Sequence, residues 1–401
     1  MRKLVLALGC SFIVLGYLSI NMGLPAFPLL ADYFDTKIAN LHLTTSLFLI
    51  TYALGQIVWG LLSERYGRRP IALCGVSLAF IGAMVSALAF SLPMFMMGRV
   101  LEGFGAAFAP TLARALAADV FEGKRLKTAF ASLITIAAIL PAIAPIIGGN
   151  LMASFGWRSI FLVMAGVSLS LLVIQFFGQI ETNQHIVKDA SVKELSRGIF
   201  ALLKHRTFLG YLIPYVLTTS GLISFYTLSP YIFITALDYS PQFYGYALLV
   251  IGLAYVLGAW IMRLLIERFD NNTILLTGFS LGVVAVVVLL LFTVFAELSV
   301  WSVCISMVIY AVSCGIISPV ANSAAISSTK VYKGTAAALF GALVMASSSV
   351  CNALFAKVNL AHLQPLCFMI GGIVVMSICF FCVLIHPSFR GQPGTRVGTM
   401  T

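Results

Sequence analysis

Apolar runs of membrane-spanning length follow one another along most of this chain. Runs of about 18 or more apolar residues predict helices that cross a bilayer. Six such runs precede a hydrophilic segment, and six follow it. The predicted spans are residues 4–30, 43–63, 71–92, 94–118, 128–152 and 159–179, then 208–236, 242–265, 273–295, 299–325, 335–357 and 363–385. The pattern therefore predicts an all-α membrane protein with twelve transmembrane helices in two six-helix halves.

The hydrophilic segment sets the expected domain boundaries. We expect an N-terminal half at 1–180, a linker at 181–207, a C-terminal half at 208–385 and a tail at 386–401. Four apolar linker residues share one side of a helix, which predicts an amphipathic helix on the membrane surface. They are Leu195, Ile199, Leu202 and Leu203.

A charged block between the second and third spans repeats weakly in the second half. The first copy runs from Gly60 to Gly67, and a similar pattern from Gly258 to Asp270 follows the eighth span. A parallel repeat of two six-helix halves is the plan of transporters that bind substrate between the halves near the membrane midplane.

Composition agrees with a membrane protein. The 401 residues are 61% hydrophobic and only 9% charged, whereas roughly a quarter of the residues of a soluble domain are charged. The net charge of +11 comes from short loops on one side of the predicted membrane. The positive-inside rule explains this distribution without a nucleic-acid partner. It predicts a multi-pass membrane protein with both termini in the cytoplasm.

The sequence offers no chemistry for an enzyme. The eight cysteines lie inside apolar spans, no histidine cluster suggests a metal site, and no Gly-rich phosphate loop suggests ATP. A membrane receptor or membrane enzyme is therefore the least supported class. We expect a monomer without cofactors that uses an ion gradient, most simply protons, to move a small molecule.

The charged block resembles the loop 2–3 signature of the major facilitator superfamily. The matching residues are Gly60, Leu62, Ser63, Glu64, Arg65, Gly67, Arg68, Arg69 and Pro70, with Glu64 where the family usually has Asp. Arg99, Glu102, Gly103 and Gly105 resemble the fourth-span motif, in which Gln usually stands at the Glu102 position. Pro141, Pro145, Gly148 and Gly149 resemble the fifth-span antiporter motif.

Further stretches resemble the Bcr/CflA branch of bicyclomycin- and chloramphenicol-type drug:proton antiporters. They are Leu24–Pro28, Tyr52–Gln56, Gly156–Phe161, Ser229–Tyr231, Ser318–Pro319 and Gly334–Gly341. The resemblance implies twelve helices, alternating access, and a latch at Gly60, Glu64, Arg65, Gly67, Arg68 and Arg69 that helps to hold the outward-open state. It also implies a hinge or external gate at Pro141, Pro145, Gly148 and Gly149, although packing alone explains these residues equally well.

Charges inside the spans need an explanation, because each costs about 2.5–3.5 kcal/mol at the bilayer centre on insertion scales. They are Arg99, Glu102 and Arg114, all in the fourth span. Arg99 and Glu102 are three residues apart and can pair on one helix face. Glu102 is either the proton-carrying acid of a central cavity or half of a permanently ionised structural pair.

The first span departs from the branch. Its usual Asp is replaced by Asn21, which cannot titrate, so Glu102 is the remaining acid well inside a span. The arginines favour neutral, zwitterionic or anionic ligands over lipophilic cations. Other polar residues either line the cavity or form interhelical hydrogen bonds. We expect the cavity to contain Tyr17, Asn21, Tyr52, Gln56, Arg99, Glu102, Arg114, Tyr226 and Asn322.

Two transport functions fit these features. The first is multidrug efflux by proton antiport, which would confer antibiotic resistance. The alternative is a dedicated metabolite or siderophore carrier, either an exporter or an importer, with altered or absent proton coupling. Asn21 and the cavity arginines favour this alternative.

Overall fold

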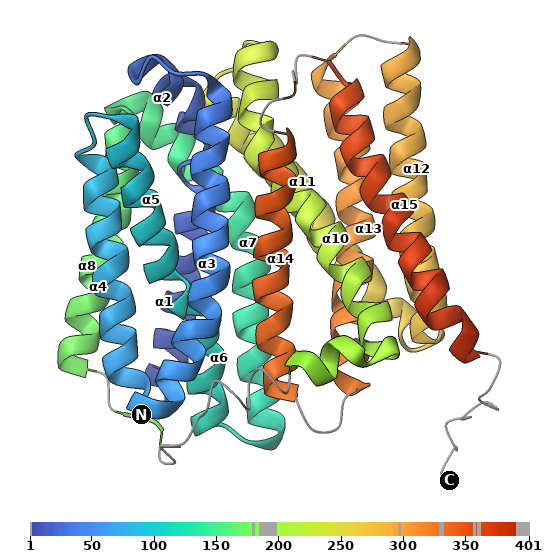
Figure 1. Ribbon diagram of the computed structural model, residues 1–401, viewed down its shortest axis with the longest axis horizontal. Coiled ribbons are helices and arrows are strands. Elements are labelled where there is room, and N and C mark those ends of the chain that lie inside the picture. Colours follow the sequence, from blue (N-terminus) through green and yellow to red (C-terminus); the bar gives the residue numbers. More distant parts are fainter. Residues whose placement is uncertain are drawn as a thin grey trace.

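The first half of the chain folds into a bundle of long helices in a computed structural model (Figure 1). The structure describes residues 2–178, 181–183, 199–295, 298–328, 333–355, 358 and 362–389. The N-terminal half contains α1 (Arg2–Asn21), η1 (Leu24–Ala26), α2 (Phe27–Tyr33), α3 (Ile38–Tyr66), α4 (Arg68–Ala87), α5 (Leu92–Ala106), α6 (Phe108–Val120), α7 (Gly123–Phe155) and α8 (Trp157–Gly178).

The second half repeats this arrangement. It contains α10 (Arg206–Pro230), the π-helical turn η2 (Tyr231–Ala236), α11 (Pro241–Leu265), α12 (Asn271–Phe295), α13 (Val300–Ser327), α14 (Lys333–Phe355) and α15 (Gln364–Phe389). The described residues form helices and turns, without a β-strand.

The helices account for the twelve predicted spans. Within the described residues, nine segments are long and apolar enough to cross a membrane. The other three crossings are α5 continued by α6, then α7, and then α14. Two spans are less regular than predicted. The first breaks at Pro25 and Pro28, because proline lacks the N–H that a helix interior needs, and the fourth is interrupted at Ala107.

The two halves meet through two equivalent helix pairs. The second span, α3, packs on the eleventh, α14, and the fifth, α7, packs on the eighth, α11. The two pairs are equivalent because each half of the repeat has six spans. The second span corresponds to the eighth, and the fifth corresponds to the eleventh. The packing therefore follows the parallel repeat that the sequence indicates.

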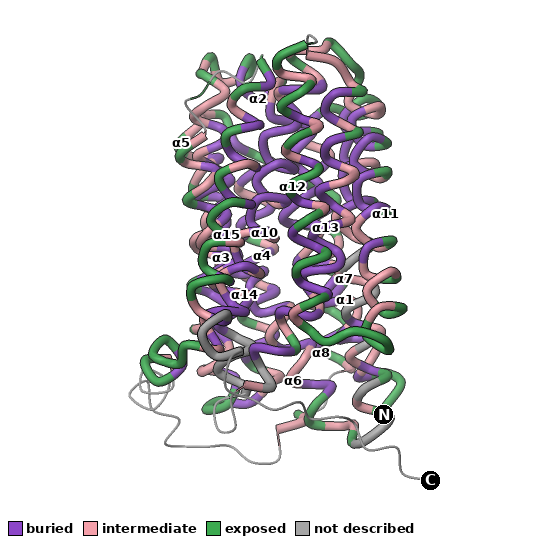
Figure 2. Tube along the Cα trace, turned by 90° about the vertical axis from the view of Figure 1, so that its right-hand side faces the viewer, coloured by how far each residue is buried: buried purple, intermediate pink, exposed green. Residues whose placement is uncertain are grey.

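Two buried cores each draw on both halves. One lies toward the end of the bundle where α1 begins and α15 ends, and includes Phe12, Phe108, Phe208 and Phe340. The other, toward the opposite end, includes Phe27, Phe161 and Phe225. Outside these cores, large apolar side chains such as Leu169, Leu290 and Val383 are exposed, as expected for a surface in contact with lipid (Figure 2).

We call the end of the bundle that holds Arg68, Arg69, Arg125, Arg206 and Arg263 the basic end; it lies at the bottom of Figure 1. Most of the predicted linker, including Leu195, and the tail beyond residue 389 lie outside the described residues. Before α10, Leu202 is buried whereas Leu203 is exposed, and the His205 side chain caps α10 by accepting from Phe208 N.

Candidate functional site

An ion pair lies inside the N-terminal half. Arg99 and Glu102 are one helical turn apart on α5, and their side chains are 2% and 0% exposed, with 2.6 Å between Nη1 and Oε2. Arg99 Nη2 also donates to Ser19 O on α1 at 3.0 Å. A lone buried charge is very unfavourable, so each partner of the pair offsets part of the desolvation cost of the other.

Aromatic rings and a close helix approach complete the surroundings of this pair. The Arg99 guanidinium lies 4.2 Å from the ring centre of Phe48 and 5.8 Å from that of Phe161, a favourable cation–π arrangement. Gly82 on α4 has no room for a side chain, because a β-carbon there would collide with the Glu102 backbone. All of these contacts belong to the N-terminal half. That Arg99 and Glu102 line the central cavity stays a prediction.

Arg114 lies instead where the halves meet. Its Nε donates to Pro110 O at 2.9 Å, so the side chain folds back by one turn along α6. Close to this turn of α6, helices α1, α3 and α6 approach one another. A β-carbon on Gly16 of α1 would lie 3.2 Å from the Ala109 side chain and 2.8 Å from Tyr52 Oη. Arg114 interacts electrostatically with Tyr17 and Tyr52 of the first half and with Tyr215 of the second.

The C-terminal half adds further polar groups to the same region. Tyr255 on α11 interacts electrostatically with Tyr17 and Tyr215, and its hydroxyl lies beside Ser318 on α13. Ser318 also hydrogen-bonds Thr219 on α10 at 3.3 Å. The residues Tyr17, Tyr52, Arg114, Tyr215 and Tyr255 form what we call the tyrosine–arginine cluster.

The other predicted cavity residues lie around this cluster. Asn21 is buried and donates from Nδ2 to Tyr17 O at 2.9 Å. Gln56 points across the junction, since a side chain at Gly341 on α14 would collide with its amide oxygen. Tyr226 interacts electrostatically with Tyr255. Asn322 is half-buried on α13, and its Oδ1 has no hydrogen-bond partner among the described residues.

Sequence reasoning missed Tyr215 and Tyr255 of this cluster, and Thr219 and Ser318 beside it. One signal was available for Tyr215. The separation between Gly60 and Gly258, which relates the two copies of the repeat, equals that between Tyr17 and Tyr215. Extending the repeat back into the first and seventh spans would have paired these two tyrosines.

The predicted gate residues of α7 lie at a tight junction with α11. A β-carbon at Gly149 would lie 2.5 Å from Pro241 O, and one at Gly245 would lie 2.8 Å from the Ile146 backbone. Nearer the middle of the helix, Gly252 lies directly against Ala142, one residue from Pro141. Gly148 has no space beside Met22 O at the end of α1. The contacts of Gly149 and Gly245 bring the halves together at the end opposite the basic end.

The predicted latch residues form a cluster at the basic end. Gly67 has a φ of +96° and separates α3 from α4. Arg68 pairs with Asp119 of α6 at 3.1 Å and donates to Ser63 Oγ at 2.7 Å. Arg69 donates to Phe176 O at 2.8 Å. Glu64 is exposed, and Arg65 stacks on Tyr66.

The carboxylate that caps α4 comes from Glu181, beyond α8. It accepts from Arg68 N at 2.8 Å and from Arg69 N at 2.9 Å, two of the amides that a helix start leaves unpaired. Gly67 is required here, because a β-carbon would lie 2.5 Å from Glu181 Oε2. These contacts join the N-terminal half to the first residue of the predicted linker, and the contact of Gly60 with Thr111 lies within that half. The role of the cluster as a latch between states stays a prediction.

Backbone amides control the ionisation of Glu181. Burial raises the pKa of its carboxyl, but N–H groups of Asn183, Arg68 and Arg69 outweigh that effect and lower the pKa below its usual value. A lowered pKa in the folded state means that the ionised group stabilises the fold at neutral pH. That contribution is lost as pH falls through the folded-state pKa, below the ordinary carboxyl value of about 4.3.

Replacing Glu181 by alanine should expose the start of α4. Loss of a helix cap costs about 0.5–2 kcal/mol, so hydrogen exchange at the amides of Arg68 and Arg69 should speed up several-fold. Exchange of the segment 60–75, measured by mass spectrometry in detergent, tests this. Glu64→Ala is the matched control, because Glu64 is exposed. Equal exchange in the two variants would contradict the cap.

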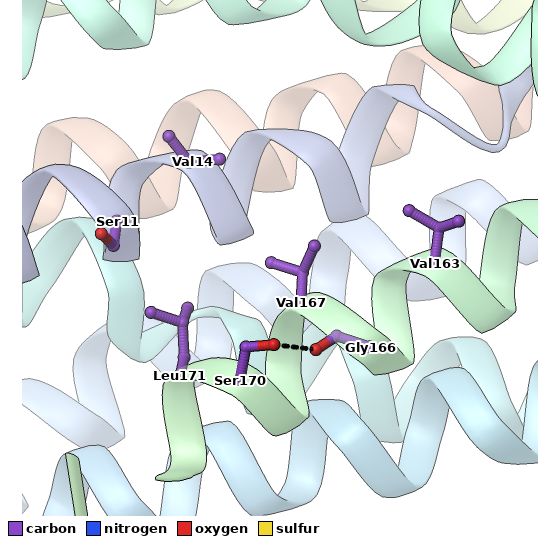
Figure 3. Close-up of a pocket in the computed structure, with 7 residues that line it drawn as sticks. All are labelled: Ser11, Val14, Val163, Gly166, Val167, Ser170 and Leu171. Carbon is purple, nitrogen blue, oxygen red and sulfur yellow. Dashed lines mark hydrogen bonds between the residues drawn. The ribbon is translucent and has the colours of Figure 1, made fainter. Parts of the chain in front are cut away.

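An apolar groove lies between α1 and α8 (Figure 3). It has a volume of about 440 Å³ and is lined by Ser11, Val14, Val163, Gly166, Val167, Ser170 and Leu171. Its two hydroxyls bond their own helices, Ser11 to Ala7 O and Ser170 to Gly166 O. The groove therefore has no free polar group with which to orient a cargo.

Two repeated membrane halves that enclose polar residues from both sides define a secondary transporter. The sequence profile of the Major Facilitator Superfamily matches residues 9–352. The chain belongs to this superfamily, as its motifs suggested, and is a transporter rather than an enzyme.

Relatives and solved structures agree with this assignment. A bicyclomycin resistance protein homolog of Haemophilus influenzae is 25% identical, over 93% of this chain and 94% of its own. Multidrug resistance protein MdtL of Klebsiella pneumoniae subsp. pneumoniae is also 25% identical, over 94% and 95%. The structure of a D-xylose-proton symporter has a TM-score of 0.78 at 15% identity and covers 95% of this chain and 97% of its own. The predicted fold is therefore confirmed.

Proposed function

We propose that this protein exports small organic molecules across the bacterial inner membrane by alternating access, driven by proton antiport. One observation carries the proposal. The tyrosine–arginine cluster draws Tyr17, Tyr52 and Arg114 from one half and Tyr215 and Tyr255 from the other. A molecule bound there would contact both halves and would change sides as they rock. Relatives named for bicyclomycin and multidrug resistance support export.

The direction of insertion follows from charge. Short loops at the basic end carry most of the arginines, and the positive-inside rule assigns such loops to the cytoplasm. The contact between α7 and α11 would then close the outer side. In this orientation the Glu181 cap and the linker lie in the cytoplasm.

Proton coupling is assigned to Glu102. Among the described carboxylates it is the one enclosed within the bundle, and its partner Arg99 also holds α1 at Ser19 O, two residues from Tyr17. Protonation would remove the charge that fixes Arg99. A change at Glu102 would therefore reach the cluster through α1.

Glu102→Gln tests this coupling. In proteoliposomes, we expect substrate-driven proton flux to fall at least tenfold while substrate–substrate exchange persists, because exchange needs no net proton movement. Glu267→Gln, at an exposed acid near the basic end, is the control and should behave as the unmodified protein. Unchanged proton flux in Glu102→Gln would remove Glu102 from the mechanism.

A dedicated metabolite or siderophore carrier is the second candidate. Asn21 cannot titrate, and Arg114 has no acidic partner among the described residues. Susceptibility profiling separates the two functions. A gain of resistance to unrelated drugs on overexpression supports multidrug efflux, whereas a growth defect of a deletion strain on one nutrient or iron source supports the dedicated carrier.

A further inference from the structure

Arg114 is a cation whose charge no described carboxylate balances. Of its five N–H donors, Nε bonds Pro110 O. The ion pairs formed by described residues are Arg68 with Asp119 and Arg99 with Glu102, and neither involves Arg114. The side chain is half-buried, and its terminal nitrogens are not among the fully enclosed polar atoms that lack partners. The outer edge of the guanidinium is therefore open to a ligand.

The same membrane segment provides an internal comparison. Arg99, fifteen residues earlier on the same span, is enclosed by a carboxylate, a backbone carbonyl and two aromatic rings. These contacts are what a structural arginine inside the bundle needs. Arg114 has a single carbonyl contact, so a purely structural role leaves its charge without compensation.

The described side chains that interact electrostatically with Arg114 can bind an anion but cannot neutralise the arginine. They are the phenol groups of Tyr17, Tyr52 and Tyr215. Phenols titrate near pH 10 and remain neutral donors at physiological pH. Their hydroxyls can donate to an anion held by the guanidinium, and their rings offer apolar faces to the rest of a molecule.

Charge balance selects the class of anion. A guanidinium binds one carboxylate through two parallel hydrogen bonds. One carboxylate neutralises one arginine, whereas a dianion would leave an unpaired negative charge between the halves, which is again unfavourable in this environment. A cation would be repelled by Arg114.

We propose that the tyrosine–arginine cluster is a binding site for organic monocarboxylates, in which Arg114 holds the carboxylate and the tyrosine rings hold an aromatic or apolar body. The proposal rests on the proposed function and names its substrate class. The site joins both halves, so a bound monocarboxylate contacts each of them.

Binding of three carboxylates to the purified protein in lipid nanodiscs tests the site. The probes are benzoate, 2-naphthoate and decanoate, and isothermal titration calorimetry measures their affinities. We expect at least one probe to bind. For that probe, Arg114→Gln should weaken binding by 10- to 100-fold. Arg114→Lys keeps the charge but loses the two-pronged geometry, so it should retain an intermediate affinity.

Matched controls separate charge from shape and from misfolding. Arg263→Gln removes an arginine at the basic end of α11 and should leave the affinity unchanged. The amide 2-naphthamide should not distinguish Arg114→Gln from the unmodified protein, because it has no charge to pair. A monodisperse elution profile and a Tm close to that of the unmodified protein show that each variant is folded. If Arg114→Gln fails this check, the test compares Arg114→Lys with the unmodified protein, and 2-naphthamide with 2-naphthoate.

Two outcomes overturn the proposal: none of the three carboxylates binds the unmodified protein, or Arg114→Gln and Arg263→Gln bind them equally well. Transport of chloramphenicol, a neutral drug, distinguishes this failure from failure of the proposed function. Chloramphenicol export without carboxylate binding rejects the anion site alone. Carboxylate binding without transport of any cargo rejects export and leaves the site standing.

Discussion

Arg99→Met should strongly destabilise the protein, and adding Glu102→Met should restore most of the loss. Each single replacement leaves one buried charge without its partner, a change that costs about 3–5 kcal/mol. The double replacement removes both charges and leaves apolar side chains of similar volume among Phe48, Phe161 and Ser19. Thermal unfolding in detergent of the four proteins gives the coupling energy through a double-mutant cycle.

Transport activity should not follow stability in the same four proteins, because the double replacement restores stability but not transport. If Glu102 carries the proton, the stable double variant should fold and reach the membrane but lose proton-coupled transport.

For the stability measurement, Asp119→Ala with Arg68→Ala is the matched control, because that pair is partly exposed and such pairs contribute about 0–1 kcal/mol. Stability losses at Arg99 and Glu102 that simply add would contradict a coupled pair.

Gly149→Ala should open the junction between α7 and α11. The new β-carbon would lie 2.5 Å from Pro241 O and 2.9 Å from its carbonyl carbon. A clash with backbone cannot be relieved by rotating a side chain. Overpacking typically costs about 1–3 kcal/mol, so the population should shift by about 5- to 150-fold toward states in which this end is open.

Spin labels at Lys37→Cys and Tyr239→Cys, exposed positions at this end of the two halves, measure that shift. The exposed cysteines Cys74, Cys379 and Cys382 are first replaced by alanine. Gly166→Ala is the control, because a β-carbon there meets nothing within 4 Å. Identical distance distributions for Gly149→Ala and Gly166→Ala would show that the junction is not a gate.

Hydropathy predicted the helices well, because a bilayer requires long apolar runs whatever their neighbours are. The orientation of side chains is a separate question. The i, i+3 spacing of Arg99 and Glu102 correctly predicts their ion pair, whereas their place at the central cavity stays a prediction. The direction in which the pair points depends on how closely α4 approaches at Gly82, which spacing within one span does not encode.

Contacts between distant segments were also beyond the sequence pattern. Glu64 lies in the family motif, yet the carboxylate on the start of α4 is that of Glu181, more than a hundred residues later. Free amides at a helix start attract any nearby carboxylate, and only the folded chain determines which one is near. Tyr255 on α11 likewise interacts with Tyr17 on α1, because α7 packs against both of these helices.

The unbalanced charge of Arg114 also has an electrical consequence. Moving one elementary charge through the membrane potential is worth about 2.3 kcal/mol per 100 mV. A carrier with Arg114 unoccupied has a net charge where the two halves meet, whereas one loaded with a monocarboxylate is neutral there. Voltage would then act on the return of the empty carrier rather than on the loaded step. In cells with a negative interior it would favour the state that keeps Arg114 near the cytoplasm, ready for the next anion.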